Sequence, residues 1–578
     1  MKLKYIIAAA LVIGTTASCS DFLDQDNKSS VPASNFYNTK GGFESLTNSM
    51  YGSLRSLYKV SPLTLTAGTD LFGDGKSSGV SMNYYQHTAT EGNVLTLYTN
   101  LFKIIQAANS VIAYGETTED SNVRKQYIDE ARFVRAWAYF MAVQHFGPVA
   151  LVEEMYTSAQ MNFERISLKD LYDFMIGEFD YLAHSSSLLD NSNVGRANKR
   201  AAKFFLAKAY LTRGWLNGQD YESQEENIAQ GTDFQNAAKY ALEAINNEIP
   251  SISIEKAFDI NNEANDEFFW AIQFSSSTLA NPGSDGSYQQ AQFGAYLGGA
   301  EMPNSKAIDG NESPFFRLLN MYTKGDGRLE QTFMLELYGT GTTAGGIQYF
   351  NYYTNKTAPI LAYYVPAWAT DADIADWKAD DPNGQKTNTI ITKTTLDNTG
   401  IGPSTQVHAT WKERRSMDVG VPCIKKFDDY TATSIGNRST ACSTHDVVVS
   451  RLGEAYLIAA EAYLQAGDKD KAAEMINKLR QRPGTIKAGF EAAMTVTAND
   501  INIDFILDER AREMAGEYVR YTDLKRTHKL VEYVTMYNED GITEAQMKGD
   551  DGKYKILRPI PQDALDKNQT KVAQNPGY

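Results

Sequence analysis

Helical periodicity at both ends of the chain constrains the fold more than any other feature of the sequence. Residues 123–146 place apolar side chains on two faces of one helix. The first face carries Ala131, Val134, Ala138 and Met141, and the second carries Phe133, Trp137 and Phe140. A helix with two apolar faces is typically buried between layers. We therefore expect a helical scaffold in which Trp137 belongs to the core.

Further segments have the same periodicity. They are residues 168–186, 196–214, 233–247 and 448–484. We expect the second to end at Gly214, because glycine favours the position after a helix. In the last, the break at Gly467 and Asp468 separates two apolar stripes. This predicts an antiparallel helix pair like those of tetratricopeptide repeats, although the regular period of about 34 residues is missing.

The middle of the chain has a different composition. Residues 251 to about 445 are rich in Gly, Thr, Asn and Tyr. Within 268–277, large apolar residues alternate with their neighbours, which predicts a strand and places Trp270 in the core. Long stretches without periodicity surround it, and such stretches often carry function.

Together these patterns predict a mostly α fold with an irregular, loop-rich middle and a few short strands. We expect one globular domain over residues 36–578. Its helical parts would be 36–250 and 446–578, and its loop-rich insertion about 251–445.

The first residues have the layout of a cleaved targeting signal. Lys2 and Lys4 precede an apolar run over 5–13 that is too short to span a bilayer as a helix. Small residues then lead to Cys19, which is typical of a bacterial lipoprotein signal. An ordinary signal with a chance cysteine is the alternative. We predict a signal peptide over 1–18, lipidation at Cys19, a polar tether over 19–35, and membrane attachment through the lipid alone.

The charge of the chain argues against a nucleic-acid partner. It has 55 Lys and Arg against 71 Asp and Glu, a formal net charge of -16 at pH 7. Binding to phosphate backbones requires clustered Lys and Arg, which this balance does not favour. Beyond Cys19, the sequence has two cysteines, Cys423 and Cys442. We favour two unpaired thiols, with a disulfide as the alternative.

Catalytic and metal-binding signatures are missing from the sequence. It contains no HExxH or GxSxG motif, and its six histidines are scattered. The aspartates within 371–381 lack the glycine and final glutamate of a calcium loop, so we interpret this stretch as a solvated acidic loop. Glycoside hydrolysis needs only two carboxylates, which leaves that alternative open. We expect no catalytic residue, no metal and no cofactor.

Six segments, in order, resemble the SusD/RagB family of Bacteroidetes surface lipoproteins. They are CSDFLD (19–24), EARFVRAWAYFMAVQHFGPVALV (130–152), GRANKRAAKFFLAKAYL (195–211), SRLGEAYLIAAEAYLQAG (450–467), ERAREMAGEYVRYTDLKR (509–526) and LRPIPQDALDKNQTKVAQNPGY (557–578). The resemblance implies a helical scaffold with tetratricopeptide-like pairs, anchored to the outer membrane and facing outward. It implies capture of oligosaccharides, or in some members of peptides, for a SusC-like TonB-dependent transporter, without enzyme activity.

The charged segment 509–526 invites a catalytic interpretation, but the matching family segment is structural. Its charges include Arg510, Arg512, Glu513, Glu517, Arg520 and Asp523. Asp508 and Arg512 stand at i,i+4, a spacing at which opposite charges support a helix.

Aromatic side chains on polar loops are the candidate ligand contacts, because sugar rings present apolar C–H faces to them. Family members often place contacts in two regions that these residues match, although the family has no fixed motif there. The candidates are Asp70, Tyr84, Tyr85, Tyr288, Phe293 and Tyr296, with three glutamines beside Tyr288 and with Trp368 and Trp377 as secondary candidates. Loop packing or transporter contact is the alternative for the aromatic residues, and a turn cap is the alternative for Asp70.

Overall fold

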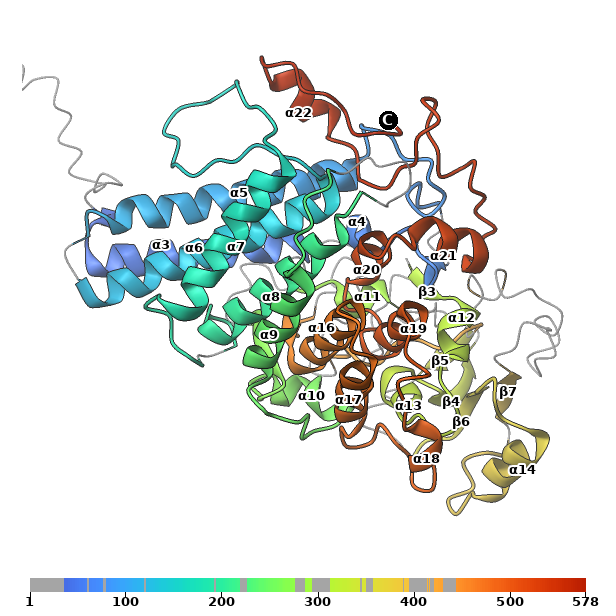
Figure 1. Cartoon of the computed structure of the whole chain (residues 1–578). Helices are drawn as coiled ribbons and strands as arrows, with labels where there is room; N and C mark the ends of the chain where they lie inside the picture. Colours follow the sequence, from blue (N-terminus) through green and yellow to red (C-terminus); the bar gives the residue numbers. More distant parts are fainter. Residues whose placement is uncertain are drawn as a thin grey trace, which may run out of the picture.

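Helices from the two ends of the chain lie side by side in one scaffold (Figure 1). The computed structural model describes residues 36–59, 62–75, 79–118, 121–191, 194–218, 226–275, 286–293, 312–343, 346–349, 357–387, 389–393, 413, 415, 420–429 and 443–578. Cys19 with the signal and tether, Tyr296 and Cys442 lie outside these ranges. Cys423 is buried.

The N-terminal half supplies the longest helices. They are α3 (Lys40–Leu54), α5 (Gly92–Gly115), α6 (Ser121–Phe146), α7 (Leu168–His184), α8 (Lys199–Trp215) and α9 (Asp233–Ile245), and shorter turns are η2 (Arg55–Leu57) and α4 (Leu63–Thr66). Capping fixes several starts; for example, the Asn198 side chain accepts a hydrogen bond from the Ala201 N–H at the start of α8, at 2.8 Å. The predicted helices over 123–146, 168–186 and 233–247 are thus confirmed.

The end of α8 differs from the prediction. The helix continues through Trp215, and Gly214 lies inside it. A Cβ atom on Gly214 would lie 2.8 Å from the ring of Phe234, next to the start of α9. Glycine therefore serves close approach between α8 and α9 and does not end the helix.

The C-terminal part adds the predicted helix pair, α16 (Leu452–Gln465) and α17 (Lys469–Arg480). Gly467 has a positive φ of 86°, and the Asp468 carboxylate caps α17 by accepting from the Lys471 N–H at 3.0 Å. The remaining helices are α18 (Glu491–Met494), α19 (Ile503–Glu513), α20 (Arg520–Arg526), α21 (Leu530–Tyr537) and α22 (Gln562–Lys567). Helix α16 packs against α9, α17 and α19 and so joins the two ends of the chain.

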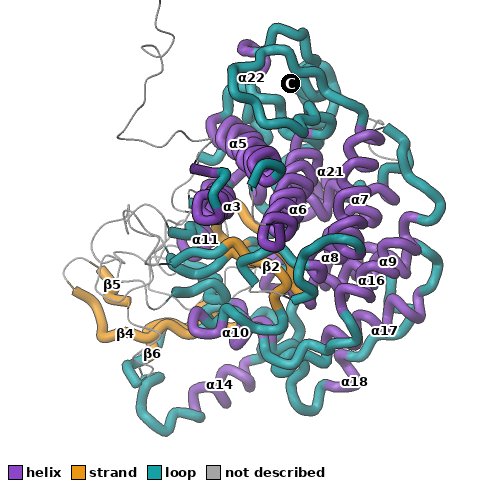
Figure 2. Tube along the Cα trace, turned by 90° about the vertical axis from the view of Figure 1, so that its left-hand side faces the viewer, coloured by secondary structure: helices purple, strands orange, loops and turns teal. Residues whose placement is uncertain are grey.

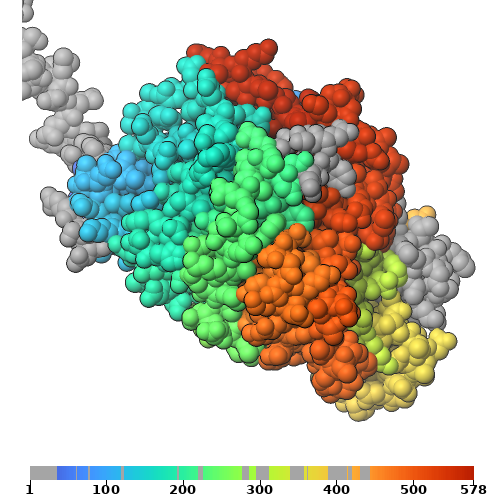
Figure 3. All heavy atoms as spheres, in the orientation of Figure 1, coloured from blue at the N-terminus to red at the C-terminus, as the bar shows by residue number. Residues whose placement is uncertain are grey.

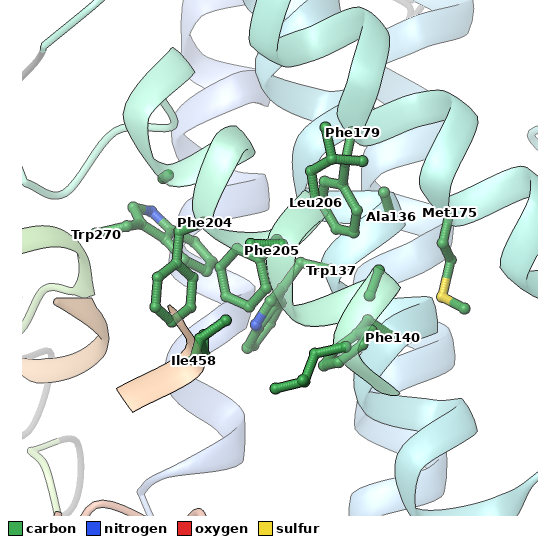
Figure 4. Close-up of a cluster of buried hydrophobic side chains, with 14 of the residues drawn as sticks. Ala136, Trp137, Phe140, Met175, Phe179, Phe204, Phe205, Leu206, Trp270 and Ile458 are labelled. Atoms are coloured by element: carbon green, nitrogen blue, oxygen red, sulfur yellow. The ribbon is translucent and has the colours of Figure 1, made fainter. Parts of the chain in front are cut away.

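The core where these helices meet is aromatic (Figure 4). Trp137 of α6 and Trp270 meet edge to face, with ring centroids 5.1 Å apart, and both are 0% exposed. Phe205 of α8 lies beside them, and Ile458 reaches the same cluster from α16. Both tryptophans are therefore core residues, as the sequence predicts.

The predicted strand within 268–277 is β2 (Phe268–Ile272), which pairs antiparallel with β8 (Val447–Arg451). All five residues of β2 are buried, so both of its faces are covered, whereas the alternation suggested one covered face. Strand β8 leads directly into α16, which ties the middle of the chain to the helical scaffold.

The middle contains more regular structure than the sequence suggests. A four-stranded sheet has the order β5 (Gly346–Tyr349), β4 (Glu336–Thr343), β6 (Ile360–Val365) and β7 (Ile390–Lys393). Strands β1 (Phe72–Asp74) and β3 (Glu312–Pro314) form a second, two-stranded sheet. The short helices there are α10 (Ile254–Ala257), η3 (Ile260–Asn262), α11 (Gln289–Gln292), α12 (Phe316–Asn320), α13 (Arg328–Thr332) and α14 (Asp371–Ala379). Figure 2 shows β4, β5 and β6 on the side of the molecule opposite α9 and α17.

Most of the acidic stretch 371–381 forms helix α14, which ends at Ala379, and this corrects the expectation of a loop. Thr370 and Asp373 make a reciprocal capping box at its start, so part of the acidic character serves the helix N-terminus. Asp381 accepts the backbone N–H groups of Gln385 and Lys386 at 2.7 and 2.9 Å. Within the described ranges, no three acidic, histidine or cysteine side chains gather as a metal site.

The charges of segment 509–526 are paired in the interior. Arg451 bonds Glu513 at 2.8 Å and Glu517 at 2.7 Å, and all three residues are buried. Asp508 pairs with Arg317 at 2.8 Å and Arg512 with Glu509 at 2.6 Å, in place of the expected i,i+4 pair. Removing one member of such buried pairs is costly, so these charges hold α19 against its neighbours.

Candidate functional site

Among the six main candidate contacts, Tyr84 and Tyr288 are the two that the structure describes as partly exposed. Tyr84 lies in the segment 62–91, which connects the first helices to α5 and contains β1. Figure 1 shows this blue segment beside the red C-terminal residues near the end of the chain. The segment is therefore built against residues that follow it by several hundred positions.

The polar centre of this segment is Asp74. Its carboxylate accepts hydrogen bonds from the Asn83 amide at 2.6 Å and from the Gly79 N–H at 2.7 Å. The Arg415 guanidinium donates to the Asp74 carbonyl at 3.1 Å and to the Asp540 carboxylate at 2.5 Å. Three parts of the chain thus meet at one polar cluster.

Glycine is required at position 73 for this meeting. A Cβ atom there would lie 2.2 Å from Nη1 of Arg415 and 2.4 Å from the ring of Phe315. The absence of a side chain lets the guanidinium cross the strand and reach Asp540. No local pattern in the sequence links Asp74, Arg415 and Asp540 as one group, because Asp74 and Arg415 are 341 positions apart and Arg415 and Asp540 are 125 positions apart.

Tyr84 lies beside this cluster. Burial, followed by the negative charges of Asp540 and Asp74, raises the pKa of the Tyr84 hydroxyl above its ordinary value. The Tyr84 ring is partly exposed and offers a surface on which a sugar ring can stack. The Asp74 residue and the Asp540 side chain are buried, at 7% and 1% exposure, so these carboxylates support the ring from inside the protein.

Asp70 has a different place from the one expected. It is 0% exposed. Its carboxylate accepts hydrogen bonds from the guanidinium groups of Arg520 at 2.6 Å and Arg317 at 2.9 Å. Burial alone would raise the pKa of Asp70, but the two guanidinium groups hold it below its usual value. The proposed role of Asp70 as a ligand contact or turn cap is corrected: its carboxylate is the centre of a buried ion pair.

Tyr85 and Phe293 are also buried, each at 1% exposure, so neither offers a ring face at the surface. The Tyr85 hydroxyl donates to the Gly68 carbonyl at 2.7 Å. Phe293 packs between Phe72 and Tyr518, with centroid distances of 5.0 and 5.4 Å. The expectation that these two rings lie exposed on loops is wrong, because tertiary contacts claim them.

Tyr288 precedes α11, and its N–H donates to the Tyr58 carbonyl at 2.8 Å. The three glutamines that follow serve the fold. The Gln289 amide donates to the Gly516 carbonyl at 2.9 Å, Gln290 accepts the Asp429 N–H at 2.5 Å, and Gln292 donates to Glu312 at 3.1 Å. These three side-chain amides therefore form hydrogen bonds inside the protein.

The secondary candidates lie near the four-stranded sheet. Trp377 stacks on Tyr363 with centroids 4.1 Å apart and planes 9° from parallel, and its N–H donates to Glu336 at 2.8 Å. The ammonium groups of Lys324 and Lys487 lie 5.9 and 5.6 Å from the centre of the Trp368 ring. Tyr363 thus covers one face of Trp377, and two cations lie near Trp368.

A cavity of about 380 Å³ lies elsewhere, between α5, the loop after α6 and the C-terminal residues. Figure 3 shows the red C-terminal residues in contact with cyan residues of the N-terminal half. Its rings are Tyr98, Phe102, Tyr156 and Phe163. The Asn568 side-chain amide donates to the Phe163 carbonyl at 2.8 Å and accepts from the Phe163 N–H at 2.9 Å. The lining of the cavity is chiefly apolar, and its polar side chains include Gln106, Gln160 and Arg165.

A family model described as "SusD family" matches residues 214–578, and one described as "Starch-binding associating with outer membrane" matches residues 21–211. The first match covers more than half of the chain, so the chain belongs to the SusD family. This confirms the resemblance that the six sequence segments carry.

Relatives and solved structures agree with this family. A SusD-like protein of Bacteroides ovatus is 29% identical over 284 residues, which are 46% of this chain and 49%, about half, of the relative. SusD-like protein P2 of Formosa agariphila is 25% identical, with both chains covered in full. The surface glycan-binding protein A of Bacteroides thetaiotaomicron, solved with laminarihexaose, has a TM-score of 0.62 at 16% identity, over 93% of this chain and 100% of that chain. This likeness shows the shared, mostly helical fold.

No helix among the described residues is both long and apolar enough to cross a membrane.

Proposed function

We propose that this protein is a lipid-anchored outer-membrane protein that captures oligosaccharides at the cell surface and delivers them to a SusC-like TonB-dependent transporter. The observation that carries the proposal is the half-buried Tyr84 ring beside the carboxylates of Asp74 and Asp540. The family description and the laminarihexaose complex of a structural relative support an oligosaccharide as the ligand. In this proposal the protein binds its ligand without a catalytic step.

The charges around Tyr84 favour a neutral glycan. The charges that act on Tyr84 include the carboxylates of Asp74 and Asp540, and the nearby Arg415 is already bonded to Asp540 and to the Asp74 carbonyl. A uronate or a sulfated sugar would bring a second negative charge toward these groups, which costs free energy at short range.

Isothermal titration calorimetry tests the binding step. The ligands are neutral hexaoses, including laminarihexaose and maltohexaose, and an oligogalacturonate of similar length. We expect saturable binding of at least one neutral hexaose and a loss of at least about ten-fold in affinity for Tyr84→Ala, which corresponds to about 1.4 kcal/mol. Tyr156→Ala is the matched control, because Tyr156 is 40% exposed but lies at the apolar cavity.

Three results would contradict the proposal or part of it. Binding of none of the sugars would contradict oligosaccharide capture. Peptides that copurify with the protein would then identify peptides as the ligand class. Tighter binding of the oligogalacturonate would refute the neutral ligand class. An equal loss of affinity for Tyr84→Ala and Tyr156→Ala would contradict the assignment of the ligand site to Tyr84.

Cross-linking in intact outer membranes, followed by mass spectrometry, tests the delivery step. We expect peptides of this protein linked to a β-barrel transporter, and a mature N-terminus at a diacylated Cys19. Membranes that contain the protein without such cross-links would contradict the transporter partnership, and an unmodified Cys19 would contradict the lipid anchor.

A further inference from the structure

We infer that Lys555 and Tyr578 are positioning residues, which lock a strained turn at Tyr85 and thereby hold Tyr84 at the ligand surface. The inference rests on the function proposed above. It begins with the backbone of Tyr85, which has a positive φ of 57°. A bulky residue rarely adopts this left-handed conformation, because its Cβ approaches the following carbonyl. Such strain persists only where surrounding contacts hold it in place, and it concentrates at functional sites.

Besides the local bond from its N–H to the Met82 carbonyl at 3.4 Å, two longer-range contacts hold Tyr85, one at its side chain and one at its backbone. The hydroxyl donates to the Gly68 carbonyl at 2.7 Å. The Lys555 ammonium donates to the Tyr85 carbonyl at 2.6 Å. Gly68 itself has a positive φ of 81°, and a Cβ there would lie 3.0 Å from the Met82 carbonyl. The turn is therefore fixed from both of its sides.

Tyr578 makes a third contact, two residues after the strained position. Its hydroxyl oxygen lies 2.6 Å from Nε2 of His87, and the two atoms share a hydrogen bond. Burial and the nearby Arg558 and Lys555 lower the pKa of His87 to about 2, so the imidazole is neutral. The Lys555 ammonium lies 5.6 Å from the Tyr578 ring, so the two residues contact the turn as one group.

This group is itself anchored to the scaffold. The Asn575 amide donates to the carbonyls of Phe146, at the end of α6, and Arg558, at 2.9 and 2.7 Å. The Gly577 N–H donates to Asp551 at 3.1 Å. These hydrogen bonds thus connect the C-terminal residues that contact the turn to the end of α6.

Tyr84 lies between the fixed points. On one side, Asn83 is bound to Asp74 at 2.6 Å. On the other side, Tyr85 is 1% exposed and bound to Lys555. With both neighbours held, Tyr84 is the ring that remains partly exposed. Releasing Tyr85 would let the turn relax toward negative φ, and the Tyr84 ring would leave its place beside Asp74 and Asp540.

Calorimetry with the neutral hexaose that binds the wild-type protein tests the inference. We expect Lys555→Met to weaken binding about ten-fold and Tyr578→Phe several-fold. Lys555→Arg retains a donor and should restore most of the affinity. Lys553→Met is the matched control, because Lys553 is exposed two positions earlier in the chain. Thermal unfolding of each variant reports whether the fold is retained.

A double-mutant cycle gives the decisive readout. If Lys555 acts through Tyr84, Lys555→Met should cost no further affinity once Tyr84 is alanine. An equal loss in both backgrounds would mean a general structural role and would overturn the inference. Wild-type affinity in Lys555→Met, together with weak binding in Tyr84→Ala, would overturn it while leaving the proposed function intact. Absence of hexaose binding by the wild-type protein would overturn both.

Discussion

Glu312 offers a quantitative test of the electrostatics beneath the candidate site. It begins β3, lies opposite Asp74 in the register of β1 and β3, and is 0% exposed. Its carboxyl group accepts hydrogen bonds from Thr66 at 2.9 Å and from Gln292 at 3.1 Å. Burial, with a further contribution from Asp74, outweighs these bonds and raises the pKa of Glu312 from 4.5 to about 7.

A raised pKa makes the stability of the protein depend on pH. Between pH 4.5 and about 7, folded Glu312 retains a proton that the unfolded chain has already released. The stability that this group contributes therefore falls as the pH rises through this window. At about 1.4 kcal/mol for each pH unit, the full loss is about 3 kcal/mol. Glutamine does not ionise, so Glu312→Gln should remove this part of the pH dependence.

Urea unfolding of both proteins from pH 4 to pH 8 measures the effect. We expect the free energy of unfolding of Glu312→Gln to rise relative to wild type by about 3 kcal/mol from pH 4 to pH 8. Glu153→Gln, at an exposed position, is the control and should stay parallel to wild type. Parallel curves for Glu312→Gln and wild type over the whole range would refute the reasoning.

Three further substitutions test the interior and the polar cluster. Asp70→Asn should lower the free energy of unfolding in urea by about 3–5 kcal/mol, because it leaves buried arginines without their partner; lost oligosaccharide affinity at unchanged stability would instead show a ligand contact. Trp270→Ala should cost about 3–5 kcal/mol in the same assay, and a cost below about 1 kcal/mol would contradict its core position. Gly73→Ala should displace Arg415 and weaken hexaose binding in calorimetry, whereas Gly41→Ala, where a Cβ meets nothing within 4 Å, should leave binding unchanged.

The helical scaffold was predictable because its signal is local. The periodicity of α6 and of the pair α16 and α17 lies within each segment, and burial follows from it. The end of α8 was not predictable from the same signal. Gly214 has the local character of a helix end, but the contact with Phe234 decides its role. The four-stranded sheet escaped prediction because β4, with its glycines and threonines, has no apolar alternation to identify it.

The candidate site was predictable as a region and not as a set of residues. Tyr84 and Tyr85 are neighbours of the same type, yet one is half-buried and the other is 1% exposed. A contact to Lys555, 470 residues later in the chain, helps to fix this difference. The local sequence around the two tyrosines does not predict that Lys555 is a partner. The same holds for Asp74, whose surroundings depend on Arg415 and Asp540.

The segments that carry the family resemblance support the region that contains Tyr84. Arg520, from segment 509–526, fixes Asp70. Arg558, from segment 557–578, donates to the carbonyls of Thr64 and Ala67 at 3.0 and 2.9 Å, and Tyr578 bonds His87. These segments therefore build the support of residues 62–91, while Tyr84 lies outside all six of them. A scaffold that fixes the ends and the turn of a loop leaves the exposed positions of that loop to vary. The resemblance can thus identify the supporting framework, whereas the ligand must be determined from the side chains that the framework presents.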